Sequence, residues 1–174
     1  MTDGAGAIVV TAAARAEVAR PIYVQGTAMA HSHRQIACMA DLTRTVAGQS
    51  AGLARERAGV ALADIDVVQL YDAFTINPIL FLEDMGFCGK GEGGAFVSGG
   101  RIAPGGELPV NTNGGGLSCV HPGMYSMFGL VEAVRQLRGE CGERQVRNAR
   151  TALVHGNGGV LSAQATTVLT NWID

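Results

Sequence analysis

NTNGGGLSCVHPGMYSMFGLVEAVRQLRG, residues 111–139, is the stretch around which the chain is organised. Three consecutive glycines, Gly114–Gly116, allow backbone angles that are closed to other residues and let a ligand approach the main chain. His121 follows and can titrate near neutral pH, and Pro122 suits a first helical position because its missing N–H costs nothing there. This order is typical of a catalytic loop that leads a histidine to a helix start; the alternative is a glycine-rich turn with a capping histidine.

A helix is predicted after this loop. Apolar side chains recur at helical spacing, at Met124, Phe128, Val131 and Val134 or Leu137. Polar side chains lie between them, at Glu132, Arg135 and Arg138. Gly139 is placed to end this helix.

Length and composition indicate a single domain with a substantial core and few surface charges. The 174 residues fit one domain, and 47% of them are apolar, enough for a substantial core. Only 16% are charged, which is below the usual quarter and favours a surface that is covered by a partner chain. The net charge is −2, Lys90 is the only lysine and the arginines are scattered, so we expect no nucleic-acid binding.

The four cysteines do not form a recognisable metal or disulfide pattern. They are Cys38, Cys88, Cys119 and Cys141. None forms a CxxC pair and their spacing fits no zinc signature, so we expect no metal. We see no signal peptide and no apolar run long enough to span a bilayer, which favours a cytoplasmic protein with free thiols.

The amino-terminal third begins abruptly. The apolar residues 8–10 predict a buried strand very close to the first residue. This position suggests that the chain begins inside a larger architecture. A short helix over 12–19 and a second strand over 22–28 follow. His31 and His33 could share a metal ion, but no nearby carboxylate or cysteine completes a site, which favours a loop or interface role.

A second helix is predicted over residues 42–57. Asp41 is a good N-cap for it, and Gly59 is placed to end it. Its apolar face is expected to include Leu42, Val46 and Leu53. Its many small residues permit close packing, which indicates a buried helix.

A buried strand over residues 67–70 then leads into Tyr71 and Asp72. An apolar run after a helix fits a βα repeat with a parallel sheet, in which ligands bind at the carboxyl ends of strands. Tyr71 and Asp72 are therefore site candidates. The alternatives are a buried aromatic with a bonded hydroxyl for Tyr71 and an N-cap of the next helix, over 77–85, for Asp72.

The remaining chain supplies a third candidate. Residues 86–110 form a long glycine-rich connection with a possible short strand over 95–97. A strand over 151–154 ends at His155, and a glycine turn joins it to a last strand over 160–169 as a hairpin. Backbone N–H groups beside His155 can stabilise a developing oxyanion. The candidates Tyr71–Asp72, His121 and His155 all lie at the ends of sheet elements. They are far apart in sequence but can converge in space.

Five ordered motifs resemble the carboxy-terminal half of the thiolase superfamily, closest to the sterol-carrier or lipid-transfer branch of acetyl-CoA acetyltransferase-like proteins. They are TDGAGAIVVT, YDAFT, NTNGGGLSCVHPG, VEAVRQLRGE and HGNGGV. The resemblance covers nearly all of residues 1–174. It implies a layered α/β/α/β/α architecture built from two similar halves, with this chain supplying mainly the second half and residues 1–20 returning from the first.

The resemblance also implies partners. The nucleophilic cysteine of a true thiolase would lie in an amino-terminal half, on a separate chain or a missing part of this one, and a homo- or hetero-oligomer is expected. Coenzyme A would enter as part of an acyl-CoA substrate, with no other cofactor. Steroid side-chain aldolases of the superfamily work with a small partner that carries an OB-fold and a zinc ribbon.

Site residues follow from the motif matches. His121 matches the histidine that activates the nucleophile, and His155 stands where thiolases have a second catalytic cysteine. Tyr71, and more loosely Tyr125, match the tyrosines that transfer protons in the aldolases. Substrate-binding or oxyanion roles are implied for Asp72, Asn113, Gly115, Gly116, Gly158 and Gly159.

Three functions remain open. The favoured one is acyl transfer, with cleavage or formation of a carbon–carbon bond in a 3-oxoacyl-CoA and a cysteine from the amino-terminal half as nucleophile. The second is retro-aldol cleavage of a 3-hydroxyacyl-CoA by Tyr71 and Tyr125, which needs no free CoA. The third is a non-catalytic half-thiolase that binds lipid or acyl-CoA, or scaffolds a complex. The chain is not expected to be active alone.

Overall fold

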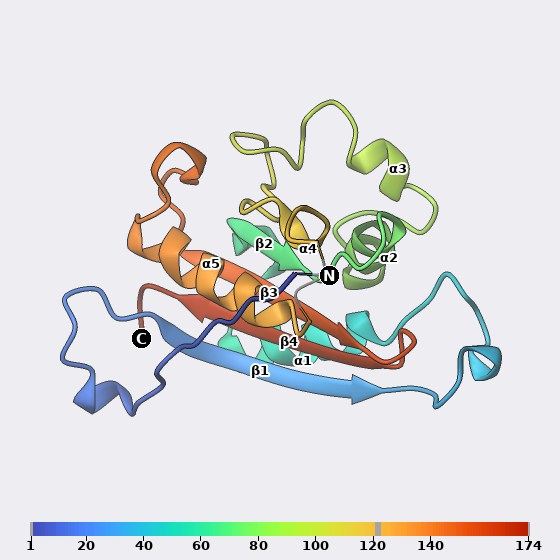
Figure 1. Ribbon diagram of the computed structural model, residues 1–174, viewed down its shortest axis with the longest axis horizontal. Helices are drawn as coiled ribbons and strands as arrows, with labels where there is room; N and C mark the ends of the chain where they lie inside the picture. The colour runs from blue at the N-terminus through green and yellow to red at the C-terminus, as the bar shows by residue number, and fades with distance from the viewer. Residues whose placement is uncertain (1, 121–122, 174) are drawn as a thin grey trace.

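A four-stranded mixed sheet forms the centre of the computed structural model, which describes residues 2–120 and 123–173 (Figure 1). The strands are β1 (Tyr23–His31), β2 (Val67–Leu70), β3 (Thr151–Gly158) and β4 (Ala163–Thr170), in the order β1-β4-β3-β2. β2 and β3 are parallel, whereas β4 is antiparallel to both of its neighbours. The predicted hairpin is confirmed, and the predicted parallel pairing holds for β2 and β3.

Helices cover both faces of this sheet. The longer ones are α1 (Ala47–Ala58), α2 (Ile76–Met85) and α5 (Ser126–Arg138). Two single-turn helices, α3 (Gly93–Phe96) and α4 (Gly115–Ser118), lie in the connections. Figure 1 shows α5 in front of the sheet and α1 behind it. Short 3-10 turns span Ala13–Arg15, Ile36–Cys38, Leu62–Asp64 and Gly142–Arg144.

Successive residues of the central strands β2 and β3 pack alternately into two separate hydrophobic cores, one on each face of the sheet. Val68 and Leu70 pack with α1 and α2, whereas Val67 packs with α5. In β3 the same alternation places Leu153 in the first core and Val154 in the second. Because both faces are covered, all four residues of β2 are buried. Three of them are apolar, and the amide of the fourth, Gln69, donates a hydrogen bond to Thr112.

Close packing of α1 depends on small residues, as its composition indicated. Ala47, Ala51 and Ala54 are fully buried against the sheet. The predicted apolar face was wrong, because the side chains of Leu42 and Leu53 are 62% and 44% exposed. Methyl groups let the helix axis lie closer to the strands than leucines would, so the larger side chains turn outward.

The start of α1 was also predicted too early. Asp41 does not cap it: its Oδ1 accepts hydrogen bonds from the backbone N–H and hydroxyl of Thr43 and so closes a local turn. The helix starts at Ala47 and ends at Gly59, which has the left-handed conformation (φ 64°). The predicted stop is therefore confirmed.

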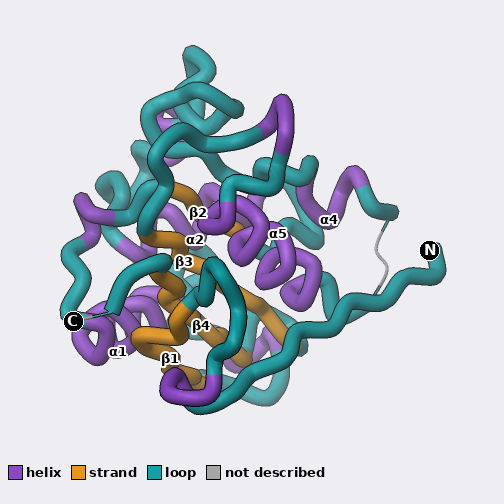
Figure 2. The backbone as a smooth tube through the Cα atoms, turned by 90° about the vertical axis from the view of Figure 1, so that its left-hand side faces the viewer, coloured by secondary structure: helices purple, strands orange, loops and turns teal. Residues whose placement is uncertain are grey.

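The amino-terminal segment differs from the prediction. Residues 8–10 form no strand, and Val9 and Val10 are 91% and 68% exposed. The predicted helix over 12–19 is reduced to the turn Ala13–Arg15. Figure 2 shows the segment as a loop running along one side of the molecule. No strand of the described sheet pairs with residues 8–10, so their strand-like sequence has no hydrogen-bonded neighbour here.

Two further predictions were wrong at the level of single elements. Residues 95–97 belong to or follow α3 rather than a strand. Met124, expected on the buried face of the next helix, precedes α5 and is 88% exposed. That helix buries Leu137, one of the predicted positions, together with Ala133, and it ends at Gly139 (φ 74°) as predicted.

None of the helices formed by the described residues combines the length and apolar character that crossing a bilayer requires.

The contact between β1 and α1 gives a stability prediction. A Cβ atom at Gly26 would collide with the carbonyl oxygen of Ala54 and lie 2.9 Å from the Ala58 nitrogen. Gly26→Ala should therefore lower the free energy of unfolding by about 2–3 kcal/mol, measured by urea denaturation.

Gly52, in the interior of α1, is the matched control because nothing lies within 4 Å of an added Cβ. Gly52→Ala should leave stability unchanged or raise it by up to about 1 kcal/mol, since alanine favours the helix. Equal losses in both variants would show that the tight helix–strand contact does not limit stability.

Candidate active site

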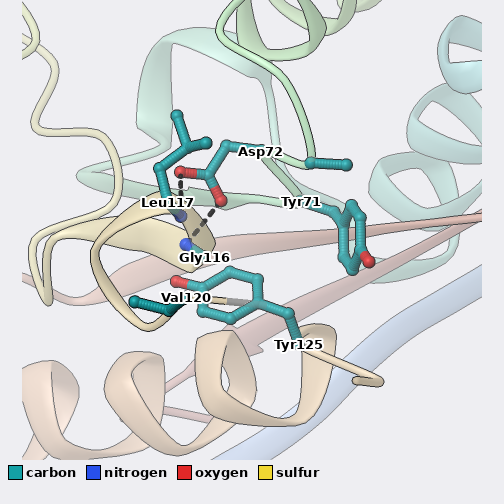
Figure 3. A pocket seen from close by; sticks show the side chains of 7 residues that line it. Tyr71, Asp72, Gly116, Leu117, Val120 and Tyr125 are labelled. Carbon is teal, nitrogen blue, oxygen red and sulfur yellow. Dashed lines mark hydrogen bonds between the residues drawn. The ribbon is translucent and has the colours of Figure 1, made fainter. Parts of the chain in front are cut away.

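A pocket of about 290 Å³ opens at the carboxyl end of β2 (Figure 3). It joins the end of that strand to the glycine loop and to the start of α5. Its lining residues are Tyr71, Asp72, Ala73, Gly116, Leu117, Val120 and Tyr125. The glycine-rich stretch over residues 111–139 thus meets the Tyr71–Asp72 motif in space, as predicted.

Asp72 fastens the glycine loop to the end of β2. Its side chain is buried, and Oδ1 accepts the N–H of Gly116 at 2.6 Å while Oδ2 accepts that of Leu117 at 3.4 Å (Figure 3). A Cβ at Gly115 (φ 76°) would collide with the Asp72 carboxylate. The alternative role of Asp72, capping the helix over 77–85, is wrong: its carboxylate binds the first turn of α4 instead.

This arrangement limits which N–H groups can meet a ligand. The Gly116 N–H donates to Asp72, and the Gly115 N–H donates to Asn113 Oδ1 at 3.0 Å. Neither N–H is therefore directed at a substrate in this arrangement. The oxyanion role predicted for these glycines stays a prediction and requires the loop to exchange partners.

Two tyrosines form one wall of the pocket. The rings of Tyr71 and Tyr125 meet edge to face, with centroids 5.9 Å apart and planes at 65°. Tyr125 is 2% exposed and stacks on Phe128, and its hydroxyl donates to Asn113 Oδ1 at 2.9 Å. In Figure 3 the two hydroxyl groups point in different directions.

The surroundings keep both phenols protonated. Burial raises the pKa of Tyr71, and the neighbouring charge of Asp72 raises it further. Burial is also the main cause of a strongly raised pKa at Tyr125. At neutral pH both side chains can therefore donate protons or hydrogen bonds, and neither is poised to act as a base.

His155 lies elsewhere. It was expected at a strand end beside open backbone N–H groups, but it lies within β3 and is 1% exposed. Its Nδ1 is 2.9 Å from Thr166 Oγ1, and its Nε2 is 2.7 Å from Gln164 Oε1. The ring also packs edge to face on Phe81. β3 continues three residues beyond His155 in the hairpin with β4, so the strand end moves away from this ring.

Burial lowers the pKa of His155 to about 4. The imidazole is therefore neutral at physiological pH, and the structure does not bring it to the pocket that holds the tyrosines. Its backbone does reach that site, because its carbonyl oxygen accepts the N–H of Tyr71 at 3.0 Å. A catalytic role for His155 remains a prediction.

The other predicted residues are dispersed. His121 and Pro122 lie outside the described residues. Gly158 and Gly159 lie at the hairpin between β3 and β4, away from the pocket lining. His33 bonds Ser32 and the carbonyl oxygen of Val160, a loop-fastening role. Among the residues that the structure describes, no three histidine, cysteine or acidic side chains cluster as metal ligands would.

A buried polar cluster lies beside the site and was not predicted from the sequence. Glu132, assigned to the polar side of its helix, is buried and forms an ion pair with Arg144, in which Nη2 and Oε2 are 3.0 Å apart. Gln136, one helical turn later, is 1% exposed. The i, i+4 pair of polar residues beside the apolar face was the available signal.

The chain belongs to the thiolase superfamily: the family model for thiolase C-terminal domain-like proteins matches residues 28–171. This match confirms the predicted relationship to the thiolase superfamily and the predicted thiolase-like α/β fold class. A solved structure described as "Ltp2-ChsH2(DUF35) aldolase" has a TM-score of 0.75 and 29% identity, covering 87% of this chain and 40% of that one.

Curated relatives span several activities. The chain is 39% identical over 163 residues to acetyl-CoA acetyltransferase of Methanothermobacter thermautotrophicus (91% of this chain, 43% of the relative). It is 41% identical over 145 residues to 17-hydroxy-3-oxo-4-pregnene-20-carboxyl-CoA lyase of Mycobacterium tuberculosis (79% and 37%). It is also 41% identical over 104 residues to sterol carrier protein 2 of Rattus norvegicus (59% and 19%), in the suspected branch. The chain thus spans less than half the length of each.

Removing the Asp72 carboxylate should loosen the loop. Asp72→Ala removes the acceptor for the Gly116 and Leu117 N–H groups, and we expect a loss of about 1–2 kcal/mol in unfolding free energy. Amide hydrogen exchange should accelerate at both positions.

Asp41→Ala is the matched control, because that carboxylate also accepts a backbone N–H but is 47% exposed. It should change the unfolding free energy much less than Asp72→Ala does, because solvent can replace the lost acceptor. A similar cost for both variants would contradict the anchoring role of Asp72.

The low pKa of His155 gives a pH prediction. The folded chain keeps the ring neutral down to about pH 4, whereas the unfolded chain protonates it below about 6.5. Acid therefore favours unfolding, and stability on the order of 3 kcal/mol should be lost between these values at about 1.4 kcal/mol per pH unit.

Histidine ring resonances in NMR should show His155 unprotonated at pH 5. His155→Gln lacks a titrating ring, so its stability should depend less on pH over the same interval. A ring that titrates near pH 6.5 would show that His155 reaches solvent.

Proposed function

We propose that the chain supplies the carboxy-terminal part of a thiolase-fold carbon–carbon lyase, which cleaves a 3-hydroxyacyl-CoA by a retro-aldol reaction. The observation that carries the proposal is the pairing of Tyr71 with Tyr125 in the wall of one pocket, both with raised pKa values. The likeness to the lyase of Mycobacterium tuberculosis and to the aldolase structure supports it.

In the proposed retro-aldol reaction, this half of the fold would supply the proton donor, because its two tyrosines are protonated at neutral pH. A base removes the proton of the 3-hydroxyl group, the C2–C3 bond breaks, and the electron pair moves into the thioester as an enolate. A proton returned to C2 yields a shortened acyl-CoA and a ketone or aldehyde. A neutral phenol can stabilise the enolate by a hydrogen bond or donate that proton.

Tyr125 fits the donor role because its position is fixed, and its hydroxyl proton, which Asn113 accepts in this arrangement, would pass to the substrate when that hydrogen bond exchanges. Its ring is held between Tyr71 and Phe128, and its hydroxyl has one defined partner in Asn113. Tyr71 lies at the carboxyl end of β2, where ligands gather in open α/β sheets. The base belongs to another group, with His121 as the candidate in this chain.

Acyl transfer on a 3-oxoacyl-CoA is the second candidate. The identity of 39% to an acetyl-CoA acetyltransferase supports it, with His121 as the base for a cysteine of an amino-terminal half. The burial of His155 and its low pKa weigh against this reading, since thiolase chemistry needs a second acid–base group at the site. A non-catalytic lipid-binding or scaffolding half requires that neither tyrosine affect turnover.

The proposal includes partners. The chain spans 37–43% of the lyase and acetyltransferase relatives, so an amino-terminal thiolase half would complete the acyl-CoA site. A small OB-fold and zinc-ribbon protein is the second proposed partner, supported by the likeness of this chain to the two-component Ltp2-ChsH2(DUF35) aldolase. Coenzyme A would be present only as part of the substrate, and the assembled protein is proposed to be oligomeric and cytoplasmic.

Replacing either tyrosine should impair cleavage. In the protein purified with its partners from the native host, Tyr71→Phe and Tyr125→Phe should each lower kcat about 10²- to 10⁴-fold, the range typical of a lost acid–base group. The probe is 17-hydroxy-3-oxo-4-pregnene-20-carboxyl-CoA, a 3-hydroxyacyl-CoA, and product is measured by mass spectrometry.

Tyr23→Phe, on the edge strand β1 and outside the pocket, is the control and should leave kcat unchanged. Cleavage should proceed without added CoA and survive alkylation of cysteine by iodoacetamide. A strict requirement for CoA, together with inactivation by iodoacetamide, would favour acyl transfer instead.

A further inference from the structure

A buried carboxylate lies behind the pocket, outside its lining. Glu132 on α5 is 3% exposed, and Arg144 binds both of its oxygens at 3.0 Å through Nε and Nη2. Oε1 also accepts the hydroxyl of Thr112 at 2.8 Å, and Nε2 of Gln136 lies 3.1 Å away. Burial alone would raise the pKa of Glu132, but these hydrogen bonds and the charge of Arg144 lower it overall, so the carboxylate stays ionised.

Thr112 is the point at which this cluster meets the glycine loop. Its side chain is buried, and its hydroxyl donates to Glu132 while accepting from Gln69 Nε2 and Gln136 Nε2, each at 3.0 Å. Gln69 belongs to β2 and the other two partners to α5. One hydroxyl therefore ties the loop to both elements that carry the paired tyrosines.

The neighbours of Thr112 in sequence hold the same two elements. Asn111 Oδ1 accepts the N–H of Leu70, the residue before Tyr71, at 2.7 Å. Asn113 Oδ1 accepts the hydroxyl of Tyr125. Asn111 also adopts a positive φ of 51°, a conformation that non-glycine residues keep only where surrounding contacts enforce it. Three consecutive side chains thus fix the loop relative to both tyrosines.

We propose that Thr112, held by the Glu132–Arg144 pair, is a positioning residue that sets where Asn113 receives the hydroxyl of Tyr125. Thr112 does not line the pocket, so it acts through Asn113 and touches no substrate. The catalytic consequence rests on the proposed function, whereas the structural consequence does not.

The structural consequence is tested on the chain itself by NMR. Tyrosine labelled with ¹³C at Cζ reports the hydrogen bond of each of the three phenols, and Tyr125→Phe assigns the Tyr125 signal. Thr112→Val should shift that signal and accelerate exchange of the Gly115 N–H, which Asn113 also binds, about tenfold. Thr112→Ser keeps the hydroxyl and should leave both near their original values.

Thr170→Val is the matched control. Thr170 is also fully buried, but its hydroxyl binds the carbonyl oxygen of Trp172 at the other end of the sheet. If Thr112→Val changes Tyr125 and Gly115 no more than this control does, the positioning role is refuted. Should Thr112→Val fail to fold, Gln69→Met removes one donor to the same hydroxyl and must move the same two signals in the same direction.

Kinetics of the assembled protein then test the catalytic consequence. Thr112→Val should lower kcat for the steroid acyl-CoA probe about tenfold while KM changes less than about threefold. In the Tyr125→Phe background it should have no further effect, because the group it positions is absent. Equal effects in both backgrounds would indicate a merely structural role.

The two proposals fail separately. If Tyr125→Phe leaves turnover unchanged, the proposed chemistry is wrong, while the NMR result still decides whether Thr112 positions the phenol. If Tyr125→Phe abolishes turnover but Thr112→Val shifts no signal, the chemistry stands and the positioning role is rejected.

Discussion

The carboxylate of Asp72 is the interaction on which the pocket depends. It leaves the carboxyl end of β2 and accepts two N–H groups from the first turn of α4, more than forty residues later in the chain. Those N–H groups have no partner within so short a helix, so an acceptor must come from elsewhere. The glycines at 115 and 116 are required because any side chain would occupy the space that the carboxylate fills. This contact fastens the loop to the end of the strand that leads into Tyr71, while Asn113 in the same loop holds the hydroxyl of Tyr125.

Near that contact, the surroundings keep the phenols of Tyr71 and Tyr125 protonated. Burial raises the pKa of both tyrosines and leaves the only described charge of the pocket lining on Asp72. His155, whose pKa is lowered by the same physical cause, is neutral inside the sheet. Desolvation thus has opposite effects on the two kinds of group: it keeps the phenols at the pocket protonated, and it keeps the imidazole inside the sheet neutral.

Elements governed by local pattern were predictable from the sequence. The apolar run 67–70, the glycine stops at 59 and 139 and the hairpin after residue 151 each depend on nearby residues alone, and all were confirmed. The pairing of Tyr71 with Tyr125 followed only from motif resemblance, since no local rule joins positions so far apart. The burial of His155 could not be predicted because its partner, Gln164, is set by tertiary packing. The spacing of Glu132 and Gln136 was a signal for a polar cluster, but the ion pair with Arg144 that makes burial of Glu132 possible is again set by tertiary packing. The segment over 8–10 has a strand sequence but no described neighbour to pair with, so propensity alone was misleading.

The order of the sheet has a consequence for how the protein acquires its shape. β1 and β2 do not pair with each other; they pair with β4 and β3 of the same hairpin, which joins Val67 to Ala152 and Tyr23 to Thr170. On a ribosome, both early strands must wait until that hairpin has emerged, and contacts between such distant segments are slow to form. Until then β2, three of whose four residues are apolar, is an aggregation-prone segment that a chaperone would be expected to shield.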